Sequence, residues 1–431
     1  MQTVLIILIF LIMCILMYTK KLSAMFALPI MAFLIALVAG IPFNNVTEGE
    51  TTSPGILTLL FADGPVRLAS TMIMLIFGAI LSQMIKMSGI AEAIVKMVSE
   101  LAGDRSMVLG ISLLVVLSAL FTTLGGLGSV IMIGTIVLPI MTSVGISSLT
   151  AGCILLFALS TGGIFNLTNW GLYIDGFGLQ VEEIRNFAYP LGIIFLIMGI
   201  LFIIVEEKFG GKIRIKKVAW PEPSTQVPLE RKVNILAMLT PIVPLIMVLV
   251  LKLDIVTALV IAIIYCFLTT ISRESMKNLT KAVTQGISDS AGALFLMIGI
   301  GMVLKVVMDP RVTEFIGPAI KGLLPQSPLL YILFFSVLAP LALYRGPFNV
   351  WGLGLGIGSI MLGTGAMPAL AIMAALMSTG QLQGICDPTN THNVWTASAT
   401  GTDVNDILRK TLPFVWIGAI IGLVIAGIRF F

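Results

Sequence analysis

Two polar stretches, far apart in the chain, share their residue types and interrupt long apolar segments. The first reads Ser-Thr-Gly-Gly-Ile-Phe-Asn-Leu-Thr-Asn over residues 160–169. The second reads Ser-Thr-Gly-Gln-Leu-Gln-Gly-Ile-Cys-Asp-Pro-Thr-Asn over residues 378–390. Unwound backbone frees carbonyl oxygens, and these oxygens, with Thr and Asn side chains, suit a hard cation such as Na⁺. The amino ends of half-helices suit an anion. The pair therefore predicts a ligand site.

Two other apolar segments, 106–145 and 327–363, carry glycines and polar residues near their middles. Each segment forms either two tight spans or a re-entrant hairpin, and the glycine content favours the hairpin. The second contains Arg345, and an arginine in mid-membrane costs at least about 2.5–3.5 kcal/mol and usually marks function. Its planar fork matches a carboxylate. The alternative is a structural arginine that pairs with Asp387 or with backbone carbonyls, or that reaches outward.

Two ionisable residues accompany the second polar stretch. Asp387 lies within it, where a carboxylate would balance Arg345, help to bind a cation or take up a proton if burial raises its pKa. The alternative for Asp387 is a helix-breaking Asp-Pro turn. His392 is the single histidine of the chain, and it acts either as a proton carrier or as an ordinary hydrogen-bonding side chain.

The composition defines the class of protein. The 431 residues are 58% hydrophobic and 11% charged, so a water-soluble surface is excluded. Many apolar runs reach the roughly 18–20 residues that span a bilayer, and residues 1–18 read as a retained first span. The scattered cysteines lack metal-binding spacing. The chain also lacks an HExxH motif and paired catalytic acids, so we expect no enzyme and no catalytic residues.

The spans follow the same order twice. We expect about ten spans, each long enough for the hydrocarbon core, and two hairpins. Residues 1–206 contain the hairpin 106–145 and a broken helix at 150–174, and residues 234–431 contain the hairpin 327–363 and a broken helix at 367–396. Amphipathic helices at 90–102 and 312–324 precede the hairpins. This order predicts an all-α polytopic membrane protein with an inverted-topology repeat, an arrangement typical of transporters.

The basic residues predict the orientation. The segment 207–233, which joins the two halves, is rich in Lys and Arg, so we place it in the cytoplasm. The alternation of spans then leaves most other basic residues on the cytoplasmic side and both termini outside. We therefore expect a multi-pass protein of the cell inner (plasma) membrane. The net charge of +4 reports orientation and not nucleic-acid binding.

These features resemble the ion transporter superfamily, which includes citrate-metal symporters, gluconate permeases and divalent anion/sodium symporters. The stretch from Thr19 to Gly40 looks like the opening of the citrate symporters, and the paired hairpins and broken spans look like the whole superfamily. The Ser-Asn-Thr signature of the divalent anion symporters is absent from the hairpin tips. Dicarboxylate specificity and a full set of sodium ligands are therefore not implied.

The resemblance implies a homodimer in which a scaffold supports two transport parts that move as an elevator. It implies that an organic anion crosses with Na⁺ or H⁺. The family's sodium sites, made of hairpin tips and span breaks, would map onto Thr122, Thr123, Gly125, Thr161, Gly162, Asn166, Thr168, Asn169, Gly346, Asn349, Thr379, Gly380, Thr389 and Asn390.

Residues and resemblance together predict a secondary active transporter of a small organic anion, such as citrate, a sugar acid or a dicarboxylate. The residues expected to bind the coupling cation are Thr161, Gly162, Thr168, Asn169, Thr379, Gly380, Thr389 and Asn390. Those expected to bind the anion are Thr122, Thr123, Gly125, Gly126, Asn166, Arg345, Gly346, Asn349, Asp387 and His392. Beyond Na⁺ we expect no cofactor, and no nucleic-acid partner. The alternative is a Na⁺/H⁺ antiporter without an organic substrate.

Overall fold

The structure is a computed structural model that describes residues 1–431 except 20, 49–50, 210–232, 364 and 366. The described chain is almost entirely helical, with one antiparallel pair of short strands, β1 (Val46–Glu48) and β2 (Thr51–Ser53). Six helices within this part are long and apolar enough to cross a membrane, or up to seven if a bent helix pair forms one span. The prediction of an all-α polytopic membrane protein is confirmed.

The first part of the chain begins with the apolar helices α1 and α2 and ends with the long helix α10, which follows the broken helix α8–α9. Its amphipathic helix α5 buries Ile90, Ala91 and Val95 on one face. The helices are α1 (Gln2–Tyr18), α2 (Ala24–Val38), η1 (Thr58–Asp63), α3 (Gly64–Val66), α4 (Ala69–Met87), α5 (Ile90–Ala102), α6 (Ser106–Phe121), α7 (Gly126–Ser143), α8 (Ser148–Ile164), α9 (Leu167–Phe177) and α10 (Val181–Phe209).

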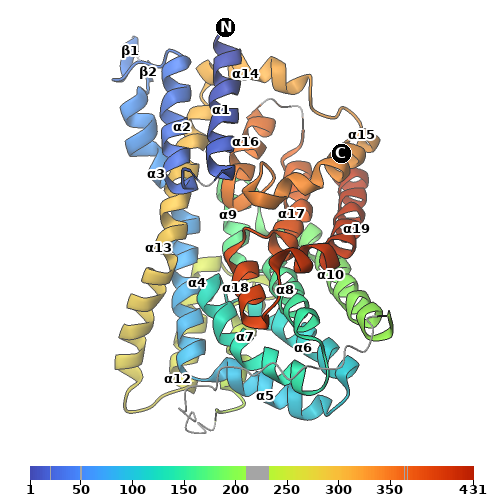
Figure 1. Cartoon of the computed structure of the whole chain (residues 1–431). Coiled ribbons are helices and arrows are strands. Elements are labelled where there is room, and N and C mark those ends of the chain that lie inside the picture. The colour runs from blue at the N-terminus through green and yellow to red at the C-terminus, as the bar shows by residue number, and fades with distance from the viewer. Residues whose placement is uncertain (20, 49–50, 210–232, 364, 366) are drawn as a thin grey trace.

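The second part of the chain runs from η2 to α19. Figure 1 places its amphipathic helix α14 at the upper end of the molecule, whereas α5 lies at the lower end. The helices are η2 (Ala237–Ile242), α11 (Val243–Leu249), α12 (Ile255–Thr269), α13 (Ser275–Val307), α14 (Pro310–Lys321), α15 (Pro328–Leu338), η3 (Ala339–Arg345), η4 (Val350–Gly354), α16 (Leu355–Gly363), α17 (Ala369–Cys386), α18 (Thr391–Thr400) and α19 (Val404–Phe430).

Several helices differ in length from the spans expected from hydropathy. Helix α13 begins at Ser275 and not near 285, and α19 begins at Val404 and not near 411. Charged residues occupy these added turns, so hydropathy does not mark them. A helix can nevertheless continue through charged residues once it leaves the hydrocarbon core. Several of the expected spans, such as α2 and α12, have only 15 residues each. Apart from its first and last residues, the predicted segment 207–233 lies outside the described residues.

The helices pack in two groups. In the first, α13 contacts α2 and α4, and α12 contacts α4. In the second, α6 and α10 contact α8, while α17 and α10 contact α19. Helices α4 and α13 join the groups, because α4 also contacts α9 and α7, and α13 also contacts α16 and α7.

Polar side chains line this seam along α4. The Oδ2 atom of Asp175 on α9 accepts hydrogen bonds from the backbone N–H and the hydroxyl of Thr71, at 2.8 and 2.7 Å. Farther along, the hydroxyls of Ser82 and Ser129 lie 2.9 Å apart. Thr71 lies in the first turn of α4, where backbone N–H groups lack helical partners. Asp175 therefore caps α4 from a neighbouring helix.

Candidate functional site

The first broken helix changes direction between Ile164 and Leu167, where α8 and α9 meet at an angle of 47°. Asn166 begins the second piece, because its side chain accepts a hydrogen bond from the N–H of Thr168 at 3.0 Å. The Asn169 amide donates to the carbonyl of Gly163 at 2.8 Å, and the Trp170 indole donates to Ile164 at 2.7 Å. These side chains hydrogen-bond to backbone N–H and carbonyl groups that lose their helical partners at the break.

The second broken helix is interrupted between Cys386 and Thr391. The buried Asp387 carboxylate accepts hydrogen bonds from the N–H and hydroxyl of Thr389, at 2.8 and 2.7 Å. Asn390 caps α18 by accepting from the N–H of His392 at 3.3 Å. Its amide also donates to the carbonyl of Gln383 at 3.2 Å. Pro388 lacks an N–H and disfavours helix in the residue before it, which accounts for a break here.

The two Ser-Thr-Gly sequences do not form the breaks, which corrects one expectation. Thr161 and Gly162 lie within α8, and Thr379 and Gly380 lie within α17. In the second sequence the Thr379 hydroxyl donates to the helical carbonyl of Ala375 at 2.9 Å, which is compatible with an unbroken helix. The buried hydroxyls of Thr161 and Ser378 have no hydrogen-bond partner among the described residues. The side chains that cap the second pieces of the broken helices are those of Asn166 and Asn390.

The two broken helices pack against each other just before they break. Ser160 on α8 donates its hydroxyl proton to Oε1 of Gln381 on α17 at 2.6 Å. Helix α18 contacts both α7 and α8. A methyl group added to Gly134 on α7 would meet the Trp395 ring at 2.5 Å, so these helices approach closely. The second piece of one broken helix thus packs on the first hairpin.

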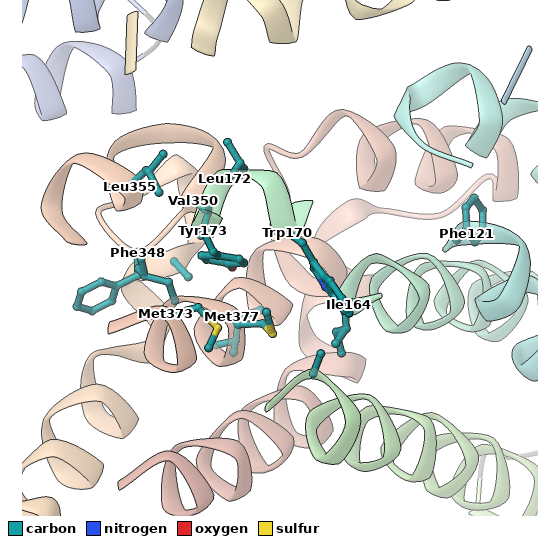
Figure 2. Packing of buried hydrophobic residues seen from close by; sticks show 14 of the residues in the cluster. Phe121, Ile164, Trp170, Leu172, Tyr173, Phe348, Val350, Leu355, Met373 and Met377 are labelled. Carbon is teal, nitrogen blue, oxygen red and sulfur yellow. The ribbon is translucent and has the colours of Figure 1, made fainter. Parts of the chain in front are cut away.

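The reciprocal contact joins α9 to the second hairpin. Figure 2 shows Tyr173 on α9 beside Phe348 and Val350 of that hairpin, with Met373 and Met377 of α17 below. All five side chains are buried. Helix α18 therefore packs on α7, and α9 packs against α16 and the segment that precedes it.

The first hairpin tip lies beside the first break. The Asn166 amide reaches the carbonyl of Phe121 at 3.4 Å. Thr122 and Thr123 are buried, and their hydroxyls donate to the carbonyls of Ala119 and Leu120. In contrast, the turn glycines Gly125 and Gly126 are exposed. Gly126 has φ +78°, a conformation that favours glycine, so this residue fits the sharp turn.

The second hairpin tip has a strained backbone. Tyr344 adopts φ +54°, which is unusual for a bulky residue and costs of order 1–3 kcal/mol. Arg345 ends η3 and is followed by Gly346 in an extended conformation. Asn349 is buried, and its side chain accepts from the N–H of Trp351 at 2.9 Å. The backbone of Arg345 is thus placed at the tip, while its side chain lies outside the described part of the structure.

One polar residue near the second break escaped the sequence prediction. Asn393 on α18 is completely buried, and among the described residues neither amide atom has a hydrogen-bond partner. An unsatisfied buried polar group costs about 1–3 kcal/mol, so such a residue marks a place that favours a polar ligand. No local signal in the sequence marked Asn393, because its burial depends on how α18 packs on α7 and α8.

The described residues contain no group of three His, Cys, Asp or Glu side chains that would hold a metal ion. A cation at the breaks would therefore be coordinated by carbonyl, hydroxyl and amide oxygens. Thr168, Asn169 and Thr389 are each partly exposed, and Thr161 is buried. A cavity of about 570 Å³ lies elsewhere, between the ends of α4, α12 and α13, and none of the predicted site residues lines it.

A solved structure has a similar fold. The chain is similar to the YdaH transporter of Alcanivorax borkumensis, which is described as having an unusual topology. The two share 14% sequence identity with a TM-score of 0.59, over 93% of this chain and 96% of that one. This chain has the fold of a membrane transporter. No protein-family model matches the sequence. No curated protein matches it either.

Proposed function

We propose that the protein is a secondary active transporter that moves a small organic anion together with Na⁺ or H⁺. The observation that carries the proposal is the meeting of the two broken helices, joined by the hydrogen bond from Ser160 to Gln381. Irregular backbone at membrane depth is tolerated only where protein or a water-filled cavity covers it. Two such breaks in contact, each beside a hairpin, suit a ligand site between the halves.

In this proposal the two halves are inverted repeats, and the hairpins α6–α7 and α15–α16 are re-entrant. The opposite placement of α5 and α14 in Figure 1 supports the inversion. The cap residues Asn166, Asn349 and Asn390 each begin a helix beside a break or tip. The amino ends of these helices carry partial positive charge. They would attract the carboxylate of a citrate, a sugar acid or a dicarboxylate, and Arg345 would pair with it.

The coupling cation would use oxygen atoms on the same breaks. The candidates are Thr161, Gly162, Thr168 and Asn169 on the first broken helix, and Thr379, Gly380, Thr389 and Asn390 on the second. Thr161, Gly162, Thr379 and Gly380 are helical. The glycines would contribute only after local unwinding, and the threonines would contribute then or through their hydroxyls. If protons drive transport, Asp387 or His392 would carry them.

Movement would follow the seam along α4. Helices α6–α10 and α15–α19 would slide as one body against α1–α4 and α11–α13, which would form the scaffold and the homodimer contact. The polar contacts of Thr71 with Asp175 and of Ser82 with Ser129 would open during each cycle. Small and polar contacts exchange partners at less cost than a large interlocked apolar face.

A Na⁺/H⁺ antiporter is the second candidate, because the buried Asp387 is the kind of carboxylate that such a protein titrates. A thermal-shift screen of organic acids, with and without Na⁺ and at two pH values, separates the two functions. Stabilisation by an organic acid that grows with Na⁺ or with acid pH supports the transporter. Stabilisation by Na⁺ alone, with no acid active, would contradict it.

A further inference from the structure

The cavity at the ends of α4, α12 and α13 is separate from the proposed anion site. Its volume of about 570 Å³ is within the usual range of small-molecule pockets, roughly 300–1,000 Å³. Helix α4 ends at Met87, α12 ends at Thr269 and α13 begins at Ser275, so the cavity lies where three helices meet. Two of these helices, α4 and α13, have the length and hydropathy of membrane spans. The cavity therefore lies near the ends of two membrane spans.

Two neighbouring residues of opposite charge line this cavity. Arg273 and Glu274 both line it, and both side chains are exposed. Within the described part of the chain neither side chain makes a hydrogen bond or an ion pair. Adjacent residues of opposite charge that do not pair with each other are available to a ligand that carries both charges.

The walls of the cavity are of two kinds. Ser272 and Asn278 provide hydrogen-bonding groups beside the charges, whereas Met84, Phe267 and Leu279 provide apolar surface. A phosphate binds an arginine fork through two parallel hydrogen bonds, and an ammonium group pairs with a carboxylate. The apolar side suits the glycerol and the first carbons of an acyl chain. Basic pockets between membrane helices bind anionic lipid headgroups. Glu274 beside Arg273 instead favours a headgroup that also carries a positive charge.

We propose that this cavity binds a phospholipid with an ammonium headgroup, such as phosphatidylethanolamine. Arg273 holds the phosphate and Glu274 holds the ammonium group. The lipid lies between the ends of α4, α12 and α13. These three helices belong to the first of the two packing groups. This site is independent of the anion site and of the coupling ion.

The test is native mass spectrometry of the full chain, purified in detergent and incubated with equal amounts of phosphatidylethanolamine and phosphatidylglycerol. We expect wild type to retain phosphatidylethanolamine preferentially. Arg273→Ala should lower retention of both lipids by about tenfold, equivalent to ~1.4 kcal/mol for a charge-assisted hydrogen bond. Glu274→Gln should abolish the preference and leave phosphatidylglycerol retention unchanged. Lys277→Ala, an exposed neighbour outside the cavity lining, should behave as wild type.

Three results would overturn the proposal. The first is equal retention of the two lipids by wild type. The second is an equal loss in Arg273→Ala and in the matched Lys277→Ala, since both remove one positive charge from the same region. The third concerns the source of the ligand. If soluble glycerophosphoethanolamine displaced bound phosphatidylethanolamine as well as the intact lipid does, the site would belong to a soluble zwitterion. Monodisperse elution of each variant in size-exclusion chromatography shows that the variant is folded.

Discussion

The Ser160 hydroxyl donates to Oε1 of Gln381 at 2.6 Å, and this hydrogen bond joins α8 to α17 where the two broken helices cross. One turn along α17, Gly384 allows the close approach, because a methyl group there would lie 2.5 Å from the Ser160 hydroxyl. The crossing depends on a glycine on one helix and a small hydroxyl on the other. It is the contact that brings the two interruptions of the chain together.

Replacing Gly384 by alanine should separate the two helices. The added methyl group overlaps Ser160, and overpacking of this kind costs typically about 1–3 kcal/mol. The matched control is Gly380→Ala on the same helix, where a methyl group would have no neighbour within 4 Å. Thermal unfolding in detergent should show a lower Tm for Gly384→Ala and an unchanged or higher Tm for Gly380→Ala. Equal Tm values would contradict the crossing.

The contact between the first hairpin and the first break can be tested in the same way. A methyl group on Gly162 would lie 2.4 Å from the carbonyl oxygen of Ser118 on α6, whereas on Gly163 it would lie 3.7 Å from its nearest neighbour. Backbone cannot yield as a flexible side chain does, so Gly162→Ala should lose several-fold in uptake rate as the hairpin shifts. Gly163→Ala should retain a larger share of the uptake. If both variants kept wild-type uptake, the contact between the first hairpin and the first break would not be part of the transport site.

Much of the fold follows from hydropathy, because most of the helices are apolar and several begin at capping residues such as Ser147 and Asp254. The amphipathic helix Ile90–Ala102 was predicted with its observed limits, and both breaks were expected in the segments where they occur. The exact position of each break was not predictable from the Ser-Thr-Gly repeat. Ser, Thr and Gly residues are tolerated within these helices, and Thr379 bonds to a carbonyl of the preceding turn. The caps Asn166 and Asn390 mark where each helix restarts.

Long-range pairs were beyond the sequence. Nothing in the chain near Thr71 indicates that its N–H and hydroxyl bind Asp175 on α9. The unsatisfied amide of Asn393 is likewise visible only after folding, since burial depends on how α18 packs on α7 and α8. Tertiary packing determines which side chains meet and which are buried, and no local sequence pattern predicts that packing.

The cap that Asp175 provides for α4 should stabilise the observed arrangement. Hydrogen bonds to a charged group contribute about 1.5–3 kcal/mol. Asp175→Ala should therefore speed hydrogen exchange at the Thr71 amide and, if α9 moves against α4 during transport, change the uptake rate. Glu314→Ala, which removes an exposed carboxylate on α14, should alter neither quantity. Unchanged exchange at Thr71 in Asp175→Ala would show that the cap is absent in the membrane.

Asn169 and Asn390 should support the coupling ion. Each amide group bonds to a carbonyl of the preceding helix, to Gly163 and to Gln383 respectively, so each side chain fixes the geometry of its break. Asn169→Ala and Asn390→Ala should each weaken the dependence of uptake on Na⁺ or on the pH gradient. In Asn390→Ala the lost helix cap should also cost about 0.5–2 kcal/mol in stability. Asn405→Ala, an exposed position on α19, is the control. Wild-type ion dependence in both break variants would argue against a paired cation site.

The central claim is that an organic anion binds between the two breaks and is held there by Arg345. The most direct measurement is uptake of labelled carboxylates into proteoliposomes by wild type, Arg345→Ala and Arg409→Ala, the last an exposed arginine on α19. The account predicts ion-driven uptake of at least one carboxylate by wild type and by Arg409→Ala. It predicts loss of that uptake in Arg345→Ala, with unchanged elution in detergent. Wild-type uptake by Arg345→Ala, or cation-driven proton movement with no carboxylate transported by wild type, would contradict it.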